Sequence, residues 1–264
     1  MKNTIRRVLN YFNYDIIRLS SHGTEKYKKN SDTVGLSYYD TPVGKYYLPA
    51  NIKKDLVANA IKNGTYFEPY VINLAKEHIK KDTSVLDVGA NYGQMSIEFS
   101  KLTGIGKIYS FEAEPHISAI LKKNILVNNR NNIEVIDGAV YNTVGEDLVF
   151  PEPDFIRFDS YGSYGVSPNI QNGRKVKTIT IDSLNIQDKI SFMKVDVQGS
   201  DLFAMQGATY TILKNKMPIL FEFEEQFQTE FGTTFNDYVE FVKSINYKFV
   251  EIISSINYLI VPNH

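Results

Sequence analysis

Cysteine and tryptophan are both absent from this chain of 264 residues. Without cysteine the protein forms no disulfide, no thiolate nucleophile and no cysteine-ligated zinc site. The chain also has no apolar run long enough to cross a bilayer, and its first residues lack the apolar core of a signal peptide. Its formal net charge is only -1, so no global basic field would hold a phosphate backbone. These absences predict a cytoplasmic protein with no transmembrane segment and no nucleic-acid partner.

The composition, 43% hydrophobic and 22% charged, is that of a globular protein with one large α/β domain and an appendage. Residues 4–18 carry apolar side chains at helical spacing, which predicts an amphipathic helix. Such a helix packs on the body, on a second subunit in a homodimer, or on a membrane surface. Residues 35–50 predict a hairpin with its turn around 40–44. We therefore divide the chain into an N-terminal helix and hairpin appendage, residues 1–65, and a core domain, residues 66–264.

From Phe67 onward the pattern alternates between helices and strands, which indicates a mostly parallel sheet. A Gly/Tyr/Pro-rich excursion at 151–174 interrupts the alternation, and two closing strands are near enough in sequence to form an antiparallel hairpin. The predicted helices cover residues 67–80, 93–102, 115–128, 200–214 and 234–245.

A glycine-rich turn follows the first core strand, in the stretch VLDVGANYG at residues 85–93. Such a turn brings bare backbone close to a ligand. A nicotinamide dinucleotide needs glycines at G-x-G-x-x-G, whereas position 91 is Asn. The acidic Asp87 before Gly89 suits the ammonium group of a bound amino acid better than a pyrophosphate.

Two further positions complete a candidate pocket. Glu112 ends the second core strand, about 20 residues past the glycine turn, where a carboxylate can accept both hydroxyls of a ribose. After the third strand, the small residues Gly138 and Ala139 leave room for a flat base. An adenosine that carries an amino-acid group fits all three positions, and S-adenosylmethionine is that molecule.

Taken in order, the motifs VLDVGANYG, YSFEAEP, KVDVQGSD, MQGA and PILFEFE resemble those of the FkbM-type S-adenosylmethionine-dependent methyltransferases, over about residues 64–262. The resemblance implies a class I methyltransferase fold, which is Rossmann-like α/β with a seven-stranded, mostly parallel sheet and an antiparallel strand in the C-terminal hairpin. It implies O-methylation of a saccharide or glycan-like acceptor. It also implies which residues hold the cofactor: Asp87, Gly89, Asn91 and Gly93 at the methionine end, Glu112 at the ribose, and Gly138 and Ala139 at the adenine.

One position departs from the family pattern. Where the family usually reads Asp-x-Glu-Gly, this chain reads Asp-Val-Gln-Gly at residues 196–199. Gln198 cannot act as a base, so a catalytic role for that position is in doubt. This departure keeps open a non-catalytic binding domain with the cofactor fold. A nicotinamide-dependent oxidoreductase is the other alternative, and the glycine spacing argues against it.

The reaction needs a group that accepts the proton of the acceptor hydroxyl. No histidine follows the fourth or fifth core strand, so the candidates are the carboxylates that end these strands: Asp196, Glu222 and Glu224. We predict Asp196 as the base or as a ligand of Mg²⁺, with Glu222 or Glu224 as its partner. In the structural alternative Asp196 caps the next helix and the glutamates are solvated.

The excursion at 151–174 carries Tyr161 and Tyr164 in a flexible, glycine-rich run. Sugar faces stack on aromatic rings, and loops of this kind often close over a bound substrate. We therefore predict that these two tyrosines contact the acceptor, with a plain connecting loop as the alternative.

Overall fold

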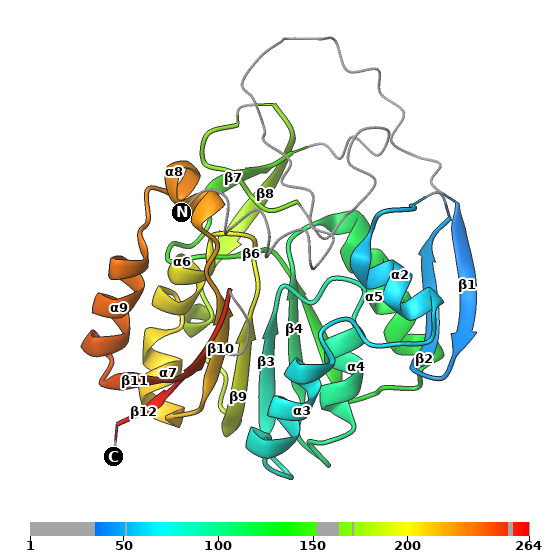
Figure 1. Cartoon of the computed structure of the whole chain (residues 1–264), viewed down its shortest axis with the longest axis horizontal. Helices are drawn as coiled ribbons and strands as arrows, with labels where there is room; N and C mark the ends of the chain where they lie inside the picture. Colours follow the sequence, from blue (N-terminus) through cyan, green and yellow to red (C-terminus); the bar gives the residue numbers. More distant parts are fainter. Residues whose placement is uncertain (1–34, 51, 152–163, 171, 253–255, 264) are drawn as a thin grey trace, which may run out of the picture. The chain divides into compact units, whose positions relative to one another are not determined.

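A computed structural model of the chain describes residues 35–50, 52–151, 164–170, 172–252 and 256–263 (Figure 1). They belong to one compact unit of the chain, Val34–His264. The helix predicted at 4–18 and the candidate acceptor contact Tyr161 lie outside the described residues. Within the described part, no helix has both the length and the apolar character needed to span a membrane.

The described residues form a central seven-stranded sheet in the order β11-β12-β10-β9-β3-β4-β5. The strands from β10 to β5 are parallel, whereas β12 runs antiparallel to both β10 and β11. This confirms the predicted mostly parallel α/β sheet with an antiparallel C-terminal hairpin. The strand bounds are β3 (Ser84–Val88), β4 (Ile108–Glu112), β5 (Ile133–Asp137), β9 (Ile190–Val195), β10 (Ile219–Glu222), β11 (Tyr247–Ile252) and β12 (Asn257–Pro262).

Helices cover both faces of the sheet (Figure 1). Because of this cover, β3 and β9 are buried along their whole lengths and read as nearly continuous apolar runs. One face packs against α3 (Pro69–His78), α4 (Gln94–Ser100) and α5 (Pro115–Val127). The other packs against α6 (Asp201–Gln206), α7 (Thr209–Asn215) and α9 (Phe235–Ser244). Short helices follow β10, namely η2 (Glu225–Phe227) and α8 (Gln228–Phe231), and η1 (Asp182–Leu184) precedes β9.

The single helix predicted over 200–214 is two helices, α6 and α7. Between them, a Cβ on Gly207 would lie 1.9 Å from the carbonyl oxygen of Tyr141. The chain therefore bends where a neighbouring loop approaches its backbone. Helical periodicity continues across this bend, so the pattern alone predicts one helix.

The predicted N-terminal hairpin is present as β1 (Leu36–Thr41) and β2 (Gly44–Pro49), paired antiparallel. Tyr46 and Leu48 of β2 are fully buried and pack in one cluster with residues of α5. The helix α2 (Leu56–Lys62) joins the same cluster. The domain boundary at residue 65 stays a prediction.

The segment between β5 and β9 contains a small three-stranded sheet in the order β6-β8-β7. Its strands are β6 (Ala139–Val140), β7 (Asp147–Phe150) and β8 (Arg174–Ile179). The turn into it is made at Gly138, whose φ of 145° is readily adopted by glycine. The small sheet therefore begins directly at the carboxyl end of β5.

Candidate functional site

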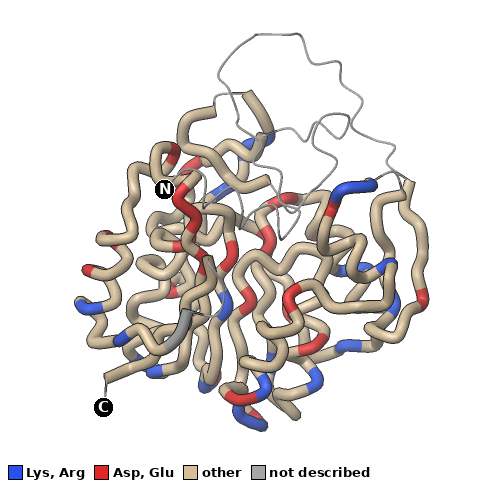
Figure 2. Tube along the Cα trace, viewed as in Figure 1, with Lys and Arg blue, Asp and Glu red and all other residues tan. Residues whose placement is uncertain are grey.

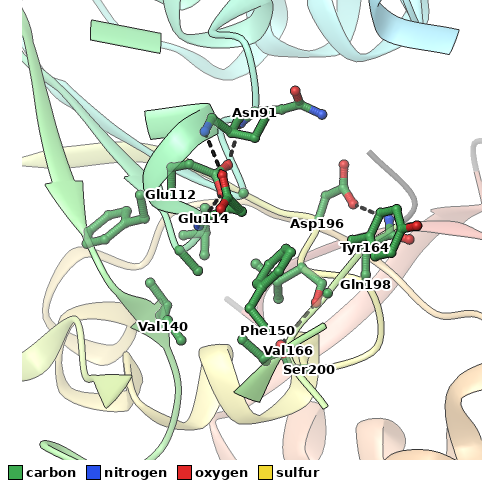
Figure 3. A pocket seen from close by; sticks show the side chains of 18 of the residues that line it. Asn91, Glu112, Glu114, Val140, Phe150, Tyr164, Val166, Asp196, Gln198 and Ser200 are labelled. Carbon is green, nitrogen blue, oxygen red and sulfur yellow. Dashed lines mark hydrogen bonds between the residues drawn. The ribbon is translucent and has the colours of Figure 1, made fainter. Parts of the chain in front are cut away.

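A pocket lies where the carboxyl ends of β3, β4 and β9 face the small sheet (Figure 3). Its empty volume is about 670 Å³, counted out to its open mouth. Ligands of open parallel sheets bind at this edge, next to the strand where the connections change direction. The pocket wall brings together these predicted residues: Gly89, Asn91, Glu112, Gly138, Ala139, Tyr164 and Asp196.

The glycine turn after β3 is held in left-handed backbone, with φ of 83° at Gly89 and 90° at Gly93. A Cβ on Gly89 would lie 1.8 Å from the carbonyl oxygen of Asp196, and one on Gly93 would lie 2.5 Å from Leu121 Cδ1. The two glycines thus let the turn pack against β9 and α5. Gly89 also lines the pocket, whereas Gly93 lies behind it at the start of α4.

Glu112 joins the turn to the end of β4. Its Oε2 accepts a hydrogen bond from the Asn91 backbone N–H at 2.9 Å, and its Oε1 accepts one from the Glu114 N–H at 2.9 Å (Figure 3). Burial raises the pKa of Glu112 to about 7, against the effect of backbone N–H groups that favour the ionised form. A carboxylate has about four lone-pair sites, so Glu112 can accept further bonds from the pocket.

The other end of the pocket is apolar. Val140, Phe150 and Val166 form part of its wall, as Figure 3 shows, and Ile117 adds to it. A slot with such walls suits a flat heterocyclic base. These residues lie on α5, on the small sheet and within the excursion at 151–174, which explains why a reading of the core strands alone missed most of them.

Glu114 also lines the pocket, and its ion pair joins the start of α5 to the small sheet. Glu114 is buried, caps α5 by accepting from the Ile117 N–H at 2.8 Å, and pairs with Arg174 of β8. The sequence reading missed this pair. The Glu-Pro step at 114–115 is a signal of a helix start, because proline favours the first helical position, but nothing local points to Arg174.

Asp87 lies beneath the turn and outside the pocket wall. Its carboxylate is fully buried and accepts a hydrogen bond from Ser96 Oγ, while Oδ1 has no hydrogen-bond partner among the described residues. Burial raises the pKa of Asp87, and the nearby Lys194 opposes this. The predicted contact of Asp87 with the amino-acid end of the cofactor stays a prediction.

A second polar group surrounds Asp196, just past β9. Its Oδ2 accepts from Lys194 Nζ at 3.1 Å, and its Oδ1 accepts from Gln198 Nε2 at 3.1 Å. Figure 3 shows Asp196 and Gln198 at the pocket, beside Tyr164. Gln198 adopts left-handed backbone with φ of 52°. Although it cannot act as a base, it holds one oxygen of the predicted base.

Two further carboxylates, Glu222 and Glu224, lie near enough to Asp196 for its charge to affect their pKa values. Glu222 ends β10, is buried, and accepts from Asn257 Nδ2 at 3.0 Å. Burial, and then the charge of Asp196, raise its pKa well above the usual range. The same two causes raise the pKa of Glu224 to about 7. Neither glutamate belongs to the pocket wall. They are not simply solvated, as the structural alternative supposed.

The predicted magnesium site at Asp196, Glu222 and Glu224 is not supported. No three acidic or histidine side chains in the described part of the chain are grouped so as to hold a metal ion. Lys194 places an ammonium group next to Asp196, with Asp87 and Glu222 near enough to affect its pKa. This cation offsets carboxylate charge that a divalent ion would otherwise balance.

The comparison with known proteins agrees with this geometry. A family model described as the methyltransferase FkbM domain matches residues 87–249, more than half of the chain. The chain belongs to the FkbM methyltransferase family. This confirms the predicted resemblance.

The comparisons include three similar proteins. A Sulfolobus acidocaldarius protein described as "probable cobalt-precorrin-6B C(15)-methyltransferase (decarboxylating)" is 30% identical over 82 residues, which cover 30% of this chain and 43% of that protein. The solved structure of an FkbM methyltransferase from Methylobacillus flagellatus is 14% identical, with a TM-score of 0.45, covering 78% of this chain and 60% of that one. A tRNA m1G37 methyltransferase from M. jannaschii is 14% identical, with a TM-score of 0.43, covering 87% and 57%.

The prediction from net charge that nucleic acid is not a partner is wrong. Solved structures similar to this chain include the tRNA methyltransferase above and a complex of aTrm5 with tRNALeu. Figure 2 shows Lys and Arg interspersed with Asp and Glu along the trace, so the net charge is the sum of many charges of both signs.

Proposed function

We propose that this FkbM-family protein transfers a methyl group from S-adenosylmethionine to a hydroxyl oxygen of a saccharide or glycan-like acceptor. The observation that supports the proposal is the placement of Asp196, a carboxylate that lines the same pocket as Gly89 and Glu112. A proton acceptor thus lies beside the residues suited to the cofactor. Methylation of a neutral hydroxyl requires such a group, because the oxygen must lose its proton.

The residues present fit the cofactor. Asn91 Oδ1 is buried and has no hydrogen-bond partner within the described part of the chain, so a ligand donor would satisfy it. Glu112 would accept the ribose hydroxyls, and Gly138 and Ala139 would flank the adenine next to the apolar wall. When bound, S-adenosylmethionine supplies a methyl group activated by its sulfonium.

Asp196 would orient the acceptor hydroxyl and receive its proton. Two donors, Lys194 Nζ and Gln198 Nε2, fix one oxygen each and leave further lone pairs for the hydroxyl. Glu222 would act as its partner, since burial and the charge of Asp196 raise the pKa of this glutamate well above its usual range. Tyr164, in the pocket wall, would contact the acceptor.

The test is a screen for release of S-adenosylhomocysteine from S-adenosylmethionine. One panel contains glycan fragments and a second contains RNA oligonucleotides, with the Asp196→Asn variant as the control for each hit. We expect turnover on a member of the glycan panel and a loss of at least about 100-fold in kcat in the variant. Turnover on RNA alone would refute the saccharide assignment. Binding of S-adenosylhomocysteine without turnover on any acceptor would favour the non-catalytic binding domain.

A further inference from the structure

Lys194 is a buried cation in the middle of the sheet, where its side chain is only 6% exposed. Its strand register pairs it with Asp87 on β3 and with Leu220 on β10. Because side chains alternate along strands, residues two further on point to the same face. Glu222 therefore shares that face with Lys194 and Asp87, and Asp196, just past the end of β9, contacts Lys194 directly.

The charged side chains of Asp87, Lys194 and Glu222 lie next to an apolar layer on the same face of the sheet. This layer contains Val85, Phe192 and Leu220, which come two residues before them on the three strands and belong to the core cluster under α3 and α4. Burial in such surroundings opposes a charged lysine. Even so, the pKa of Lys194 is raised overall, since the charges of Asp196, Asp87, Glu222 and Glu68 outweigh burial.

Asp196 also faces carboxylates that would repel it. Glu68, at the start of α3, and Glu222 approach from two elements, and both are within hydrogen-bond reach of Asn257 Nδ2, at 3.5 and 3.0 Å. Like charge comes also from Glu224, two residues past β10, and from Asp201, the first residue of α6. In both residues the pKa is raised to about 7 by burial and then by Asp196. Against this group, Lys194 supplies the charge that attracts Asp196.

We infer that Lys194 is a positioning residue of the methyl transfer, whose buried ammonium holds the Asp196 carboxylate at the pocket through the 3.1 Å contact between Nζ and Oδ2. The inference rests on the proposed role of Asp196 as proton acceptor. Lys194 is not in the pocket wall, so it acts through Asp196 and not on the acceptor. A displacement of about 1 Å in such a group can cost about 100-fold in rate.

The experiment is a double-mutant cycle on kcat with Lys194→Met, Asp196→Asn and the double variant. We expect Lys194→Met to lower kcat about 10- to 100-fold, with an unchanged affinity for S-adenosylhomocysteine and little change in the acceptor KM. In the Asp196→Asn background, the same substitution should change kcat less than about threefold. Equal effects in both backgrounds, or a main effect on cofactor affinity, would overturn the inference.

Lys189→Met is the matched control, because Lys189 precedes the same strand and donates to the Asn215 carbonyl at 3.0 Å, away from the pocket. It should leave kcat unchanged. If removal of the buried charge prevents Lys194→Met from folding, Lys194→Gln keeps a donor for Asp196 and enters the same cycle.

The outcome is separable from that of the proposed function. If the wild-type protein methylates none of the acceptors, the proposed function fails. The inference is then tested by crystal structures of the wild-type and Lys194→Met proteins with S-adenosylhomocysteine. A shift of the Asp196 carboxylate away from the pocket supports the positioning role, and an unmoved carboxylate refutes it.

Discussion

The close approach of β3 and β9 at Gly89 makes a quantitative prediction about stability. In Gly89→Ala the new methyl group would meet the Asp196 carbonyl oxygen at 1.8 Å, far inside a van der Waals contact. The obstacle is the backbone directly after β9 and not a flexible side chain that could move aside. In addition, φ of 83° at this position disfavours an L-residue.

Gly145→Ala separates the two costs. Gly145 has nearly the same backbone angle, φ of 81°, but nothing lies within 4 Å of a Cβ placed there. Left-handed backbone costs an L-residue about 1–2 kcal/mol, which is the whole expected loss for Gly145→Ala. Gly89→Ala should cost this amount plus about 1–3 kcal/mol for overpacking. The variant at Gly89 is therefore expected to be about 2–5 kcal/mol less stable than wild type.

Urea unfolding followed by circular dichroism measures both free energies of unfolding, provided that the m-value is unchanged. Equal losses for Gly89→Ala and Gly145→Ala would refute the reasoning, because the clash would then contribute nothing. Calorimetry gives a second readout. Of the two glycines compared, Gly89 lines the pocket and Gly145 does not, so only Gly89→Ala should weaken S-adenosylhomocysteine binding.

Three other predictions follow from the site. The pKa of Glu112 is raised in the fold from 4.5 to about 7, so its contribution to stability is present below about pH 4.5 and is lost as pH rises through 7. Urea unfolding of the ligand-free protein at pH 5 and pH 8 measures the decrease in the free energy of unfolding between these pH values, and Glu112→Gln should make this decrease smaller by about 3 kcal/mol. A variant with the same pH dependence as wild type would contradict this prediction. Arg174→Met leaves the buried Glu114 without its cationic partner, and we expect about 1–3 kcal/mol of destabilisation, whereas Lys175→Met, at an exposed neighbour, should cost under about 0.5 kcal/mol. Chelator should leave methyl transfer unchanged, because Lys194 offsets the carboxylate charge; activity that is lost with chelator and restored by Mg²⁺ would contradict this.

The sequence predicted the sheet because alternating apolar runs and amphipathic segments are local properties of the chain. The glycine turn and Glu112 were predictable for the same reason, since each closes a strand whose carboxyl end must lie at the ligand edge. Contacts between residues far apart in the chain were not predictable in this way. Glu68 and Asn257 are 189 residues apart in the chain and yet lie within hydrogen-bond reach, and no spacing rule relates them.

Lys194 shows why a residue at the centre of a site can escape a motif-based reading. In the run SFMKVDV, a single lysine looks like a polar interruption of a buried strand. Its role is defined by register, because Asp87 is its partner on β3 and Glu222 lies two residues beyond its partner on β10. Both strands had been predicted, but their order and register in the sheet had not. A charge network across strands therefore requires the sheet topology before its members can be recognised as neighbours.

The same topology explains how Gln198 is compatible with a working site in which the family usually has glutamate. Its amide donates to Asp196 Oδ1, while Lys194 donates to Oδ2. A glutamate at this position would add a negative charge to a region that already holds several carboxylates. The ionisable groups that shift the pKa of Lys194 include no second cation. With one buried ammonium available, an uncharged donor at 198 lets Lys194 act on Asp196 alone. The departure from the family pattern thus fits a site in which Asp196, and not residue 198, receives the proton.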